Sequence, residues 1–188
     1  GVPGTHDTEL MSAVFHSLAQ GNATNIPTFD KSIDDRAATN EWQKIESPVD
    51  IVIMEGWCWG TQAQESDALT QAVNELENKY DHDGTWRHYV NFTLTATYTP
   101  LYAYMNFWVF LKAPSFNAVY AWRREQEEKL KLRVGNASHI MSEADILTFI
   151  QHYQRLTEHT LCTLGEYADF IFELDNERNI TKSRHNAK

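Results

Sequence analysis

The order of apolar and polar positions along the chain predicts short buried strands that alternate with helices. Residues 49–54 and 107–111 are apolar runs of strand length without alternation, which is typical of strands covered on both faces. A third strand is expected at 168–174, and helices are expected after residue 7 and at 65–80, 116–133 and 143–161. Strands separated by helices of this length favour an α/β fold, in which right-handed crossovers connect parallel strands.

Two segments do not follow this pattern. Residues 92–99 alternate strictly between apolar and polar positions, which predicts a half-exposed strand. The polar stretch 22–40 has no clear periodicity, and long loops of this kind are usually functional or disordered. With 188 residues, of which 42% are apolar, the chain can bury a real core, and we expect a single domain over residues 1–188.

The composition argues against several classes of protein. A net charge of −10 does not suit a nucleic-acid-binding surface, and three glutamates interrupt the basic residues at 123–133. No apolar run is long enough to cross a bilayer, and no signal peptide is visible. The two cysteines, Cys58 and Cys162, are far apart in sequence, which favours a reducing cytoplasmic compartment over a disulfide scaffold. A secreted glycoprotein remains an alternative because Asn-x-Ser/Thr triplets begin at Asn22, Asn91, Asn136 and Asn179.

Candidate chemistry begins at the end of the first predicted strand. Ligands of open parallel sheets bind beyond the carboxyl ends of the strands, and Glu55 follows the strand expected at 49–54. A carboxylate at this position resembles the one that lies near a nucleotide's magnesium. The alternative is an ordinary residue at a strand end.

A charged loop and a charged helix supply further candidates. The loop 26–36 carries Asp30, Lys31, Asp34, Asp35 and Arg36, which could bind the hydroxyls and phosphates of a small polar substrate. These charges could also pair among themselves in a solvated loop. In the helix at 116–133, arginine and lysine could neutralise a transferring phosphoryl group. The alternative there is an ion pair four residues apart, between Arg123 and Glu127, that only stabilises the helix.

Other reactive residue types give no site. No HExxH motif and no zinc-type spacing of cysteine and histidine is present, so we do not expect a histidine-bound metal. Cys58 has no evident partner base and is expected to be a packed thiol.

Four motifs, taken in order, carry a family resemblance. They are GVPGTHD at 1–7, IPxFDKxxDDR at 26–36, Glu-Gly-Trp at 55–57 and WRxxQExKL at 122–130, and the segments at 153–157 and 168–169 also fit. The chain thereby resembles D-glycerate 3-kinase and its kinase-like relatives over about residues 1–178. This family belongs with uridine kinase, pantothenate kinase and phosphoribulokinase among the P-loop proteins.

The resemblance implies a three-layer P-loop NTPase-type parallel sheet with helices on both faces. It further implies ATP- and Mg²⁺-dependent phosphorylation of a hydroxyl on a small metabolite, with glycerate as the nearest acceptor. It also implies a helix at 86–104, against the alternation at 92–99. The residues that the resemblance implies to bind the substrate are His6, Asp7, Asp30, Lys31, Asp35 and Arg36. It implies catalytic roles for Glu55 and Arg36, with Glu55 near the metal. It also implies that a lid over the ATP phosphates contains Arg123, Gln126 and Lys129.

The sequence departs from the family at one point. Such kinases begin with a strand and a GxxxxGK[ST] loop that cradles the phosphates, and this chain contains no Gly-Lys pair. The resemblance therefore implies that the first two strands, the Walker A loop and the catalytic base precede residue 1. The chain would be the C-terminal two-thirds of the kinase domain, inactive without that N-terminal segment. The missing strand would lie between 49–54 and 107–112, whose edges would stay unpaired. The alternative is a non-catalytic binding or regulatory module on a degenerate kinase scaffold.

Overall fold

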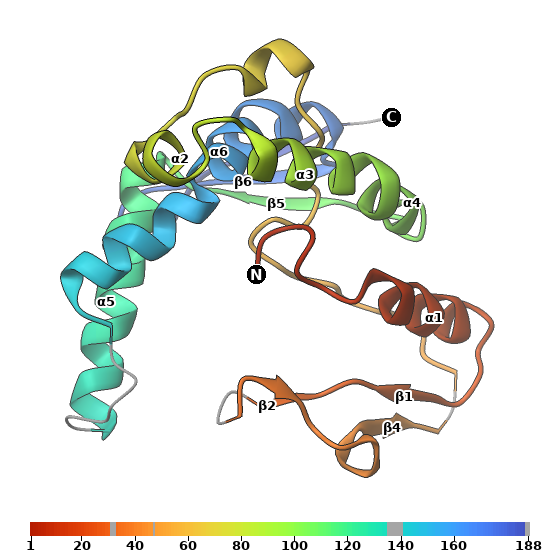
Figure 1. Cartoon of the computed structure of the whole chain (residues 1–188). Coiled ribbons are helices and arrows are strands. Elements are labelled where there is room, and N and C mark those ends of the chain that lie inside the picture. Colours follow the sequence, from red (N-terminus) through yellow and green to blue (C-terminus); the bar gives the residue numbers. More distant parts are fainter. Residues whose placement is uncertain (31–32, 47, 135–140, 187–188) are drawn as a thin grey trace. The chain divides into compact units, whose positions relative to one another are not determined.

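The computed structural model describes residues 1–30, 33–46, 48–134 and 141–186 (Figure 1). The chain forms two compact units. The small unit is His6–Glu55, and the large unit consists of Gly1–Thr5 together with Gly56–Lys188. A single domain over residues 1–188 stays a prediction.

The small unit combines one helix with two short antiparallel strand pairs. Helix α1 (Thr8–Ala19) begins directly after residue 7, as the sequence predicted, and the Asp7 carboxylate caps it by accepting a hydrogen bond from the Leu10 amide. Strand β1 (Thr24–Ile26) pairs with β4 (Gln43–Ile45), β2 (Phe29–Asp30) pairs with β3 (Asp35–Arg36), and the 3₁₀ turn η1 is Thr39–Glu41. Strands of two or three residues are too short to show a period, which explains why the sequence predicted only a loop at 22–40.

The strand predicted at 49–54 is wrong for this structure. The structure describes all six of these residues, and none of them lies in a strand. Ile51 is 78% exposed and Ile53 is 86% exposed. An apolar run indicates that burial of the segment is favourable. A strand forms only where the backbone groups of a neighbouring strand are available as hydrogen-bond partners. Within the described part of the small unit, the strand pairs are β1 with β4 and β2 with β3.

Helices make up most of the large unit. Their bounds are η2 Ser66–Leu69, α2 Glu75–Tyr80, α3 Thr85–Thr93, the π-helical turn η3 Leu94–Tyr98, α4 Thr99–Tyr102, α5 Phe116–Val134 and α6 Glu143–Tyr167. The two longest confirm the helices predicted at 116–133 and 143–161. The helix predicted at 65–80 is instead two short pieces, η2 and α2. Among the helices that the structure describes, none is both long and apolar enough to cross a membrane.

The consecutive helical segments α3, η3 and α4 confirm the helix implied at 86–104 and show that the strand interpretation of 92–99 is wrong. Leu94, Tyr98 and Leu101 are at most 3% exposed and lie four and three residues apart, which is a helical spacing. The threonines between them satisfy their hydroxyls on the helix itself: Thr97 Oγ1 donates to the Thr93 carbonyl at 3.0 Å. Residues 92–99 therefore form a helix, although threonine alternates with other residues in this segment.

The sheet of the large unit has the order β5–β6–β7. Strands β5 (Val109–Lys112) and β6 (Phe170–Leu174) are parallel, and helices α5 and α6 lie between them in the chain, which confirms the α/β class. Strand β7 (Ile180–His185) pairs antiparallel with β6 and was not predicted. All six residues of β7 are exposed, so it lacks the apolar pattern by which the other strands were found.

Helix α6 carries much of the core. It begins with a capping box, in which the Ser142 hydroxyl and the Asp145 carboxylate each accept from the other residue's amide. Its buried apolar side chains are Ile146, Ile150, Tyr153, Leu156 and Leu164. Edge-to-face contacts of Tyr102 with Trp59 and Trp108, with ring centroids 5.1 and 5.2 Å apart, continue the core toward β5.

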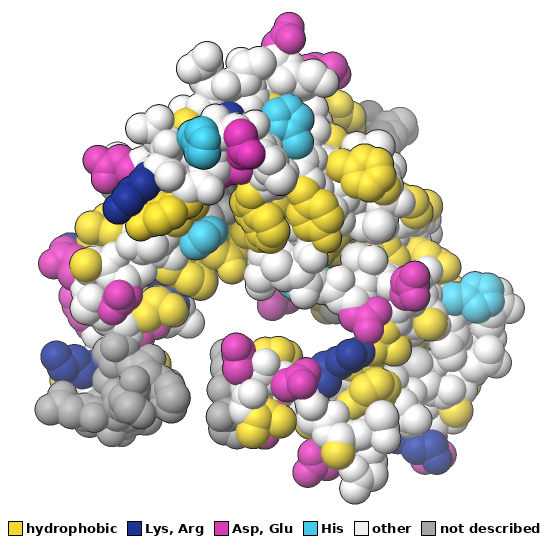
Figure 2. Space-filling view, in the orientation of Figure 1, with side chains coloured by type: hydrophobic (Ala, Val, Ile, Leu, Met, Phe, Trp, Pro, Cys, Tyr) yellow, Lys and Arg dark blue, Asp and Glu magenta, His cyan; other side chains and the backbone are white. Residues whose placement is uncertain are grey.

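The outer side of β5 leaves apolar surface in solvent. Phe110 is 7% exposed, whereas Val109 and Leu111 on the other face are 58% and 62% exposed. Strand β5 pairs with β6 along one edge, and within the described chain no strand pairs with its other edge. Figure 2 shows that apolar side chains are open to solvent over the large unit as well as the small one. An apolar strand that is exposed and unpaired along one edge is uncommon in folded proteins.

Candidate functional site

The small unit brings two of the sequence motifs into contact. Asp7 ends the GVPGTHD motif and Arg36 ends the motif at 26–36, and these residues are 29 positions apart. The Arg36 Nη1 donates to Asp7 Oδ2 at 2.8 Å. Both side chains remain nearly half exposed, at 48% for Arg36 and 44% for Asp7. A cation accessible to solvent is thus held at a fixed place by a carboxylate from another segment.

The β2–β3 hairpin carries two further carboxylates, at strand positions that alternate with those of Phe29 and Arg36. Its register sets Asp30 opposite Asp35 and Phe29 opposite Arg36. Directly opposite residues of antiparallel strands lie within side-chain reach. The Arg36 amide also donates to Asp35 Oδ1 at 2.7 Å. The hairpin therefore carries carboxylates that can accept hydrogen bonds and one guanidinium that can donate them, and groups of these kinds suit a small ligand with hydroxyls and an anionic group.

Asp7 is held in its ionised form. The hydrogen bond from the Leu10 amide, followed by the interaction with Arg36, lowers the pKa of the Asp7 carboxyl. His6, beside it, is exposed, and Lys31 lies outside the described residues. The substrate-binding roles of all these residues stay predictions.

Glu55 is the last residue of the small unit and is exposed. Among the residues that the structure describes, no group of three or more His, Cys, Asp or Glu side chains is arranged to hold a metal ion. A single carboxylate nevertheless fits magnesium chemistry, because nucleotide-bound Mg²⁺ is held by one or two carboxylates together with phosphate oxygens and water.

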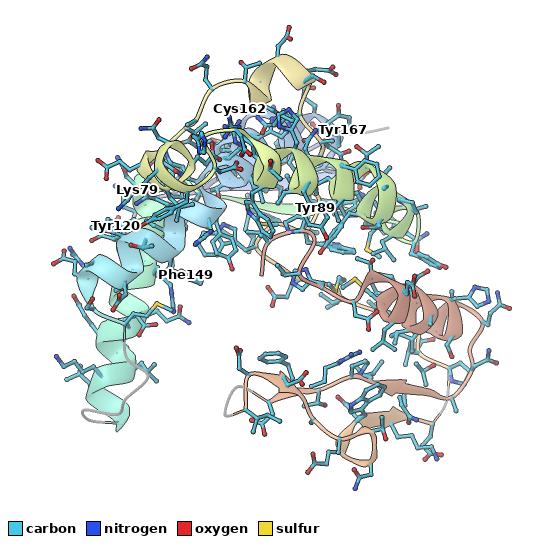
Figure 3. All side chains as sticks on the ribbon, viewed as in Figure 1. Lys79, Tyr89, Tyr120, Phe149, Cys162 and Tyr167 are labelled. Atoms are coloured by element: carbon cyan, nitrogen blue, oxygen red, sulfur yellow. The ribbon has the colours of Figure 1, made fainter. Side chains whose placement is uncertain are left out.

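The three lid candidates belong to α5 in the large unit, and each is engaged on its own helix. Arg123 forms an ion pair with Glu127, and its Nη1 donates to the Gln126 side chain at 2.6 Å. The Arg123 guanidinium also lies 5.3 Å from the ring centre of Phe149 on α6 (Figure 3). Lys129 pairs with Glu125. The pair of Arg123 with Glu127 is the one that the alternative interpretation gave, and a role of the three candidates over ATP phosphates stays a prediction. Their convergence with the clusters of the small unit stays a prediction as well.

The large unit contains a buried ion pair that the sequence did not predict. Arg155 on α6 donates from Nε and Nη2 to the two carboxylate oxygens of Glu77 on α2, at 2.8 and 2.6 Å. The same guanidinium donates to the carbonyls of Ala68 and Gln71. Both charged residues are at most 7% exposed. The only sequence signal was an arginine between the apolar positions 153 and 156 of a predicted helix, and nothing indicated its partner 78 residues away.

A second buried pair lies beside the first. Arg87 donates to the Asp81 carboxylate at 3.1 Å and to the Leu69 carbonyl at 2.6 Å. Between the two pairs is a cavity of about 20 Å³, lined in part by Glu77, Arg87 and Arg155. This volume holds roughly one water molecule, so the cavity is part of the structure and not a substrate site.

The side chain of Asn91, one of the four candidate glycosylation sites, is already hydrogen-bonded inside the fold. Its side-chain amide accepts from the Gln64 amide at 2.7 Å and donates to the Gln64 carbonyl at 2.9 Å. Both functions of the amide are therefore used inside the fold, and a glycan on its nitrogen would disturb this pairing. Asn136, another of the four triplets, lies outside the described residues.

We expect the two cysteines to differ strongly in reactivity. Cys58 is 8% exposed, and burial raises the pKa of its thiol to about 12, whereas Cys162 on α6 is exposed (Figure 3). Because the thiolate is the reactive form, a thiol reagent at pH 8 should modify Cys162 rapidly and Cys58 only after unfolding. Peptide mapping of the labelled protein measures both sites. Equal labelling of the two in the native state would contradict the packing of Cys58.

Sequence relatives cover most of the chain. No protein-family model matches it. The chain is 31% identical over 160 residues to the uncharacterized kinase mug58 of Schizosaccharomyces pombe, 29% identical to the probable ATP-dependent kinase TDA10 of Saccharomyces cerevisiae, and 27% identical to the chloroplastic D-glycerate 3-kinase of Arabidopsis thaliana. These matches cover 81%, 98% and 95% of this chain, which spans only 56%, 66% and 40% of the respective relatives.

Solved structures agree with the sequence relatives. The D-glycerate 3-kinase of Cryptococcus neoformans var. grubii matches with a TM-score of 0.81 at 23% identity, over 99% of this chain and 69% of that protein. The structure of the protein YGR205w matches with a TM-score of 0.74 at 25% identity, over 100% of this chain and 67% of that one. The motif order, the fold and these similarities together confirm the resemblance: this chain is related to the glycerate kinase-like family of kinases.

Proposed function

We propose that this chain is the acceptor-binding and lid portion of an ATP-dependent kinase that phosphorylates a hydroxyl group of a small metabolite. The observation that carries the proposal is the contact between Asp7 and Arg36, which joins two motif segments around one accessible guanidinium. The names of the relatives support an ATP-dependent kinase, and one of them makes glycerate the first acceptor to test. The two free cysteines fit a reducing compartment such as the cytoplasm.

A hydroxy acid suits the chemistry of the hairpin. The Arg36 guanidinium has a planar donor fork that matches a carboxylate or phosphate of the acceptor. Asp30 and Asp35 lie opposite each other at the same hairpin and would accept hydrogen bonds from acceptor hydroxyls. Phosphoryl transfer depends mainly on positioning and charge neutralisation, and Arg36 supplies both near the anionic end of the acceptor.

ATP would require groups from several segments. Glu55 would hold Mg²⁺ together with the nucleotide phosphates, and the ion would neutralise phosphate charge when bound. Arg123, Gln126 and Lys129 would reach the phosphates only by exchanging their present partners on α5. The phosphate loop and the catalytic base would come from parts of the whole protein outside this chain.

The free edge of β5 supports a larger sheet in the whole protein. We propose that another strand of the whole protein pairs with β5, in a three-layer arrangement. The exposed Val109 and Leu111 are the apolar surface of β5 that such an arrangement would bury.

Leu111 provides a test of this sheet. In the 188-residue chain, Leu111→Thr should change the free energy of unfolding by less than about 0.5 kcal/mol, because the side chain is 62% exposed. In the whole protein the same change should cost about 2 kcal/mol or more. Phe110→Ala, at a buried neighbour, is the control that should destabilise both forms. Denaturant unfolding measures each variant, and an equally small effect of Leu111→Thr in both would refute the added strand.

The test of the function is an assay of the whole protein with ATP and a panel of small hydroxy acids, sugars and nucleosides. We expect phosphorylated product with a hydroxy acid that carries a carboxylate, and glycerate is the first candidate. Tight ATP binding without transfer to any acceptor would refute the proposal for this panel. The absence of both binding and transfer would favour the non-catalytic module.

A further inference from the structure

Asp7 uses both oxygens of its carboxylate inside the protein. Oδ1 accepts from the Leu10 amide at 2.9 Å and thereby caps helix α1. Oδ2 accepts from Arg36 Nη1 at 2.8 Å. The positive end of the helix dipole also favours a carboxylate at this position. The side chain is therefore fixed by the helix on one side and holds a cation on the other.

Arg36 needs such an anchor, because its own strand gives little support. The β2–β3 hairpin consists of two residue pairs, and Arg36 is the last residue of β3. Its long side chain is 48% exposed. The contact with Asp7 uses one of five N–H donors, so the remaining donors can serve an anionic ligand. Helix α1 supplies the rigidity that the hairpin lacks.

We propose that Asp7 is a positioning residue for Arg36 and does not itself contact the acceptor. This inference rests on the proposed function and changes the role that the motif resemblance assigned to Asp7. Asp7 ties the guanidinium to the N-terminus of α1, so that the free donors of Arg36 face an acceptor carboxylate or phosphate in a fixed orientation. The PGTHD motif then serves acceptor binding through Arg36.

The variant Asp7→Asn separates the two uses of the carboxylate. Asparagine is as good an N-cap as aspartate, so α1 and the thermal stability should be preserved, while the ion pair with Arg36 is lost. In the whole protein we expect the KM for the acceptor to rise about fivefold, as suits an exposed pair, with the KM for ATP unchanged. The matched control is Glu9→Gln, which removes one negative charge from the exposed first turn of the same helix. It should change neither constant.

A double-variant comparison distinguishes positioning from direct contact. On an Arg36→Lys background, which lacks the donor fork, Asp7→Asn should raise the acceptor KM clearly less than fivefold. A full fivefold rise on that background would show that Asp7 acts on the acceptor independently of Arg36, and would overturn the inference. An unchanged acceptor KM in the single variant would overturn it as well.

A measurement on the 188-residue chain tests the positioning without any activity. The Arg36 Nε–Hε signal in ¹⁵N NMR should shift and become more mobile in Asp7→Asn, whereas Glu9→Gln should leave it unchanged. An equally ordered Arg36 signal in Asp7→Asn would overturn the inference even if the kinase function is correct. Conversely, loss of order in a protein that phosphorylates no acceptor would refute the proposed function and keep Asp7 as the anchor of Arg36.

Discussion

Replacement of Arg155 by methionine should destabilise the large unit by about 3–5 kcal/mol, because it leaves the buried carboxylate of Glu77 without its cation. The guanidinium makes four hydrogen bonds at 2.6–2.8 Å, two to Glu77 and one each to the carbonyls of Ala68 and Gln71. Glu77 Oε1 and the two carbonyls would lose the partner that Arg155 supplies, whereas Glu77 Oε2 would keep only the hydrogen bond from the Val73 amide. Methionine fills part of the volume, so the effect reports mainly the lost polar contacts. Denaturant unfolding followed by circular dichroism measures the change.

Arg124→Met is the matched control for this prediction. Arg124 pairs with Glu128 on the surface of α5, at 3.6 Å and with both side chains at least half exposed. Exposed pairs of this kind contribute little, so the control should stay within about 0.5 kcal/mol of the parent. If Arg155→Met proved as mild as Arg124→Met, the buried network would not hold α2 against α6.

Arg36→Ala in the whole protein should lower turnover by well over tenfold and leave ATP binding intact. The reason is that Arg36 is the accessible cation of the hairpin and carries the donor fork for the acceptor or the transferring phosphate. Asp30→Ala, in the opposite strand of the hairpin, should have an effect of the same direction and size. Steady-state kinetics with the identified acceptor, together with calorimetric ATP binding, separate the two effects.

Lys44→Ala controls for the loss of a positive charge from the small unit. Lys44 pairs with Glu46, and the two side chains are 59% and 73% exposed. Turnover of this control should stay within about twofold of the parent. If Arg36→Ala also stayed within twofold, the assignment of the hairpin to the acceptor would be wrong.

Elements that depend on local chemistry could be predicted from the sequence. Helix α6 starts at a serine with aspartate three residues later, and its apolar residues repeat with a helical period, so both its existence and its start were visible. The apolar runs before Ala113 and around Ile171 likewise identified β5 and β6. Strand β7 could not be found, because an exposed strand that pairs along one edge needs no apolar pattern.

The candidate site was predictable only in part. The order of the motifs in the sequence indicates Asp7, Asp30 and Arg36 as candidates, and it indicates the family that the comparisons support. No local pattern could indicate that Asp7 and Arg36 meet, because this contact depends on how the hairpin folds back toward α1. The sequence also gave no indication that Lys129 pairs with Glu125, although the spacing of four residues made the pair of Arg123 with Glu127 one of two alternatives.

The sequence by itself determined the α/β class, the long helices, two strands of the sheet and the kinase-like motif order, since each depends on periodicity, caps or residue identity over short distances. Only the tertiary structure decided which charges are buried together, as for Arg155 with Glu77, and which apolar run becomes a strand. Residues 49–54 have the composition of a buried strand but no strand beside them among the described residues, and so they remain exposed. A strand needs the backbone groups of a neighbouring strand as hydrogen-bond partners, and the apolar pattern of one segment does not show whether that neighbour is present.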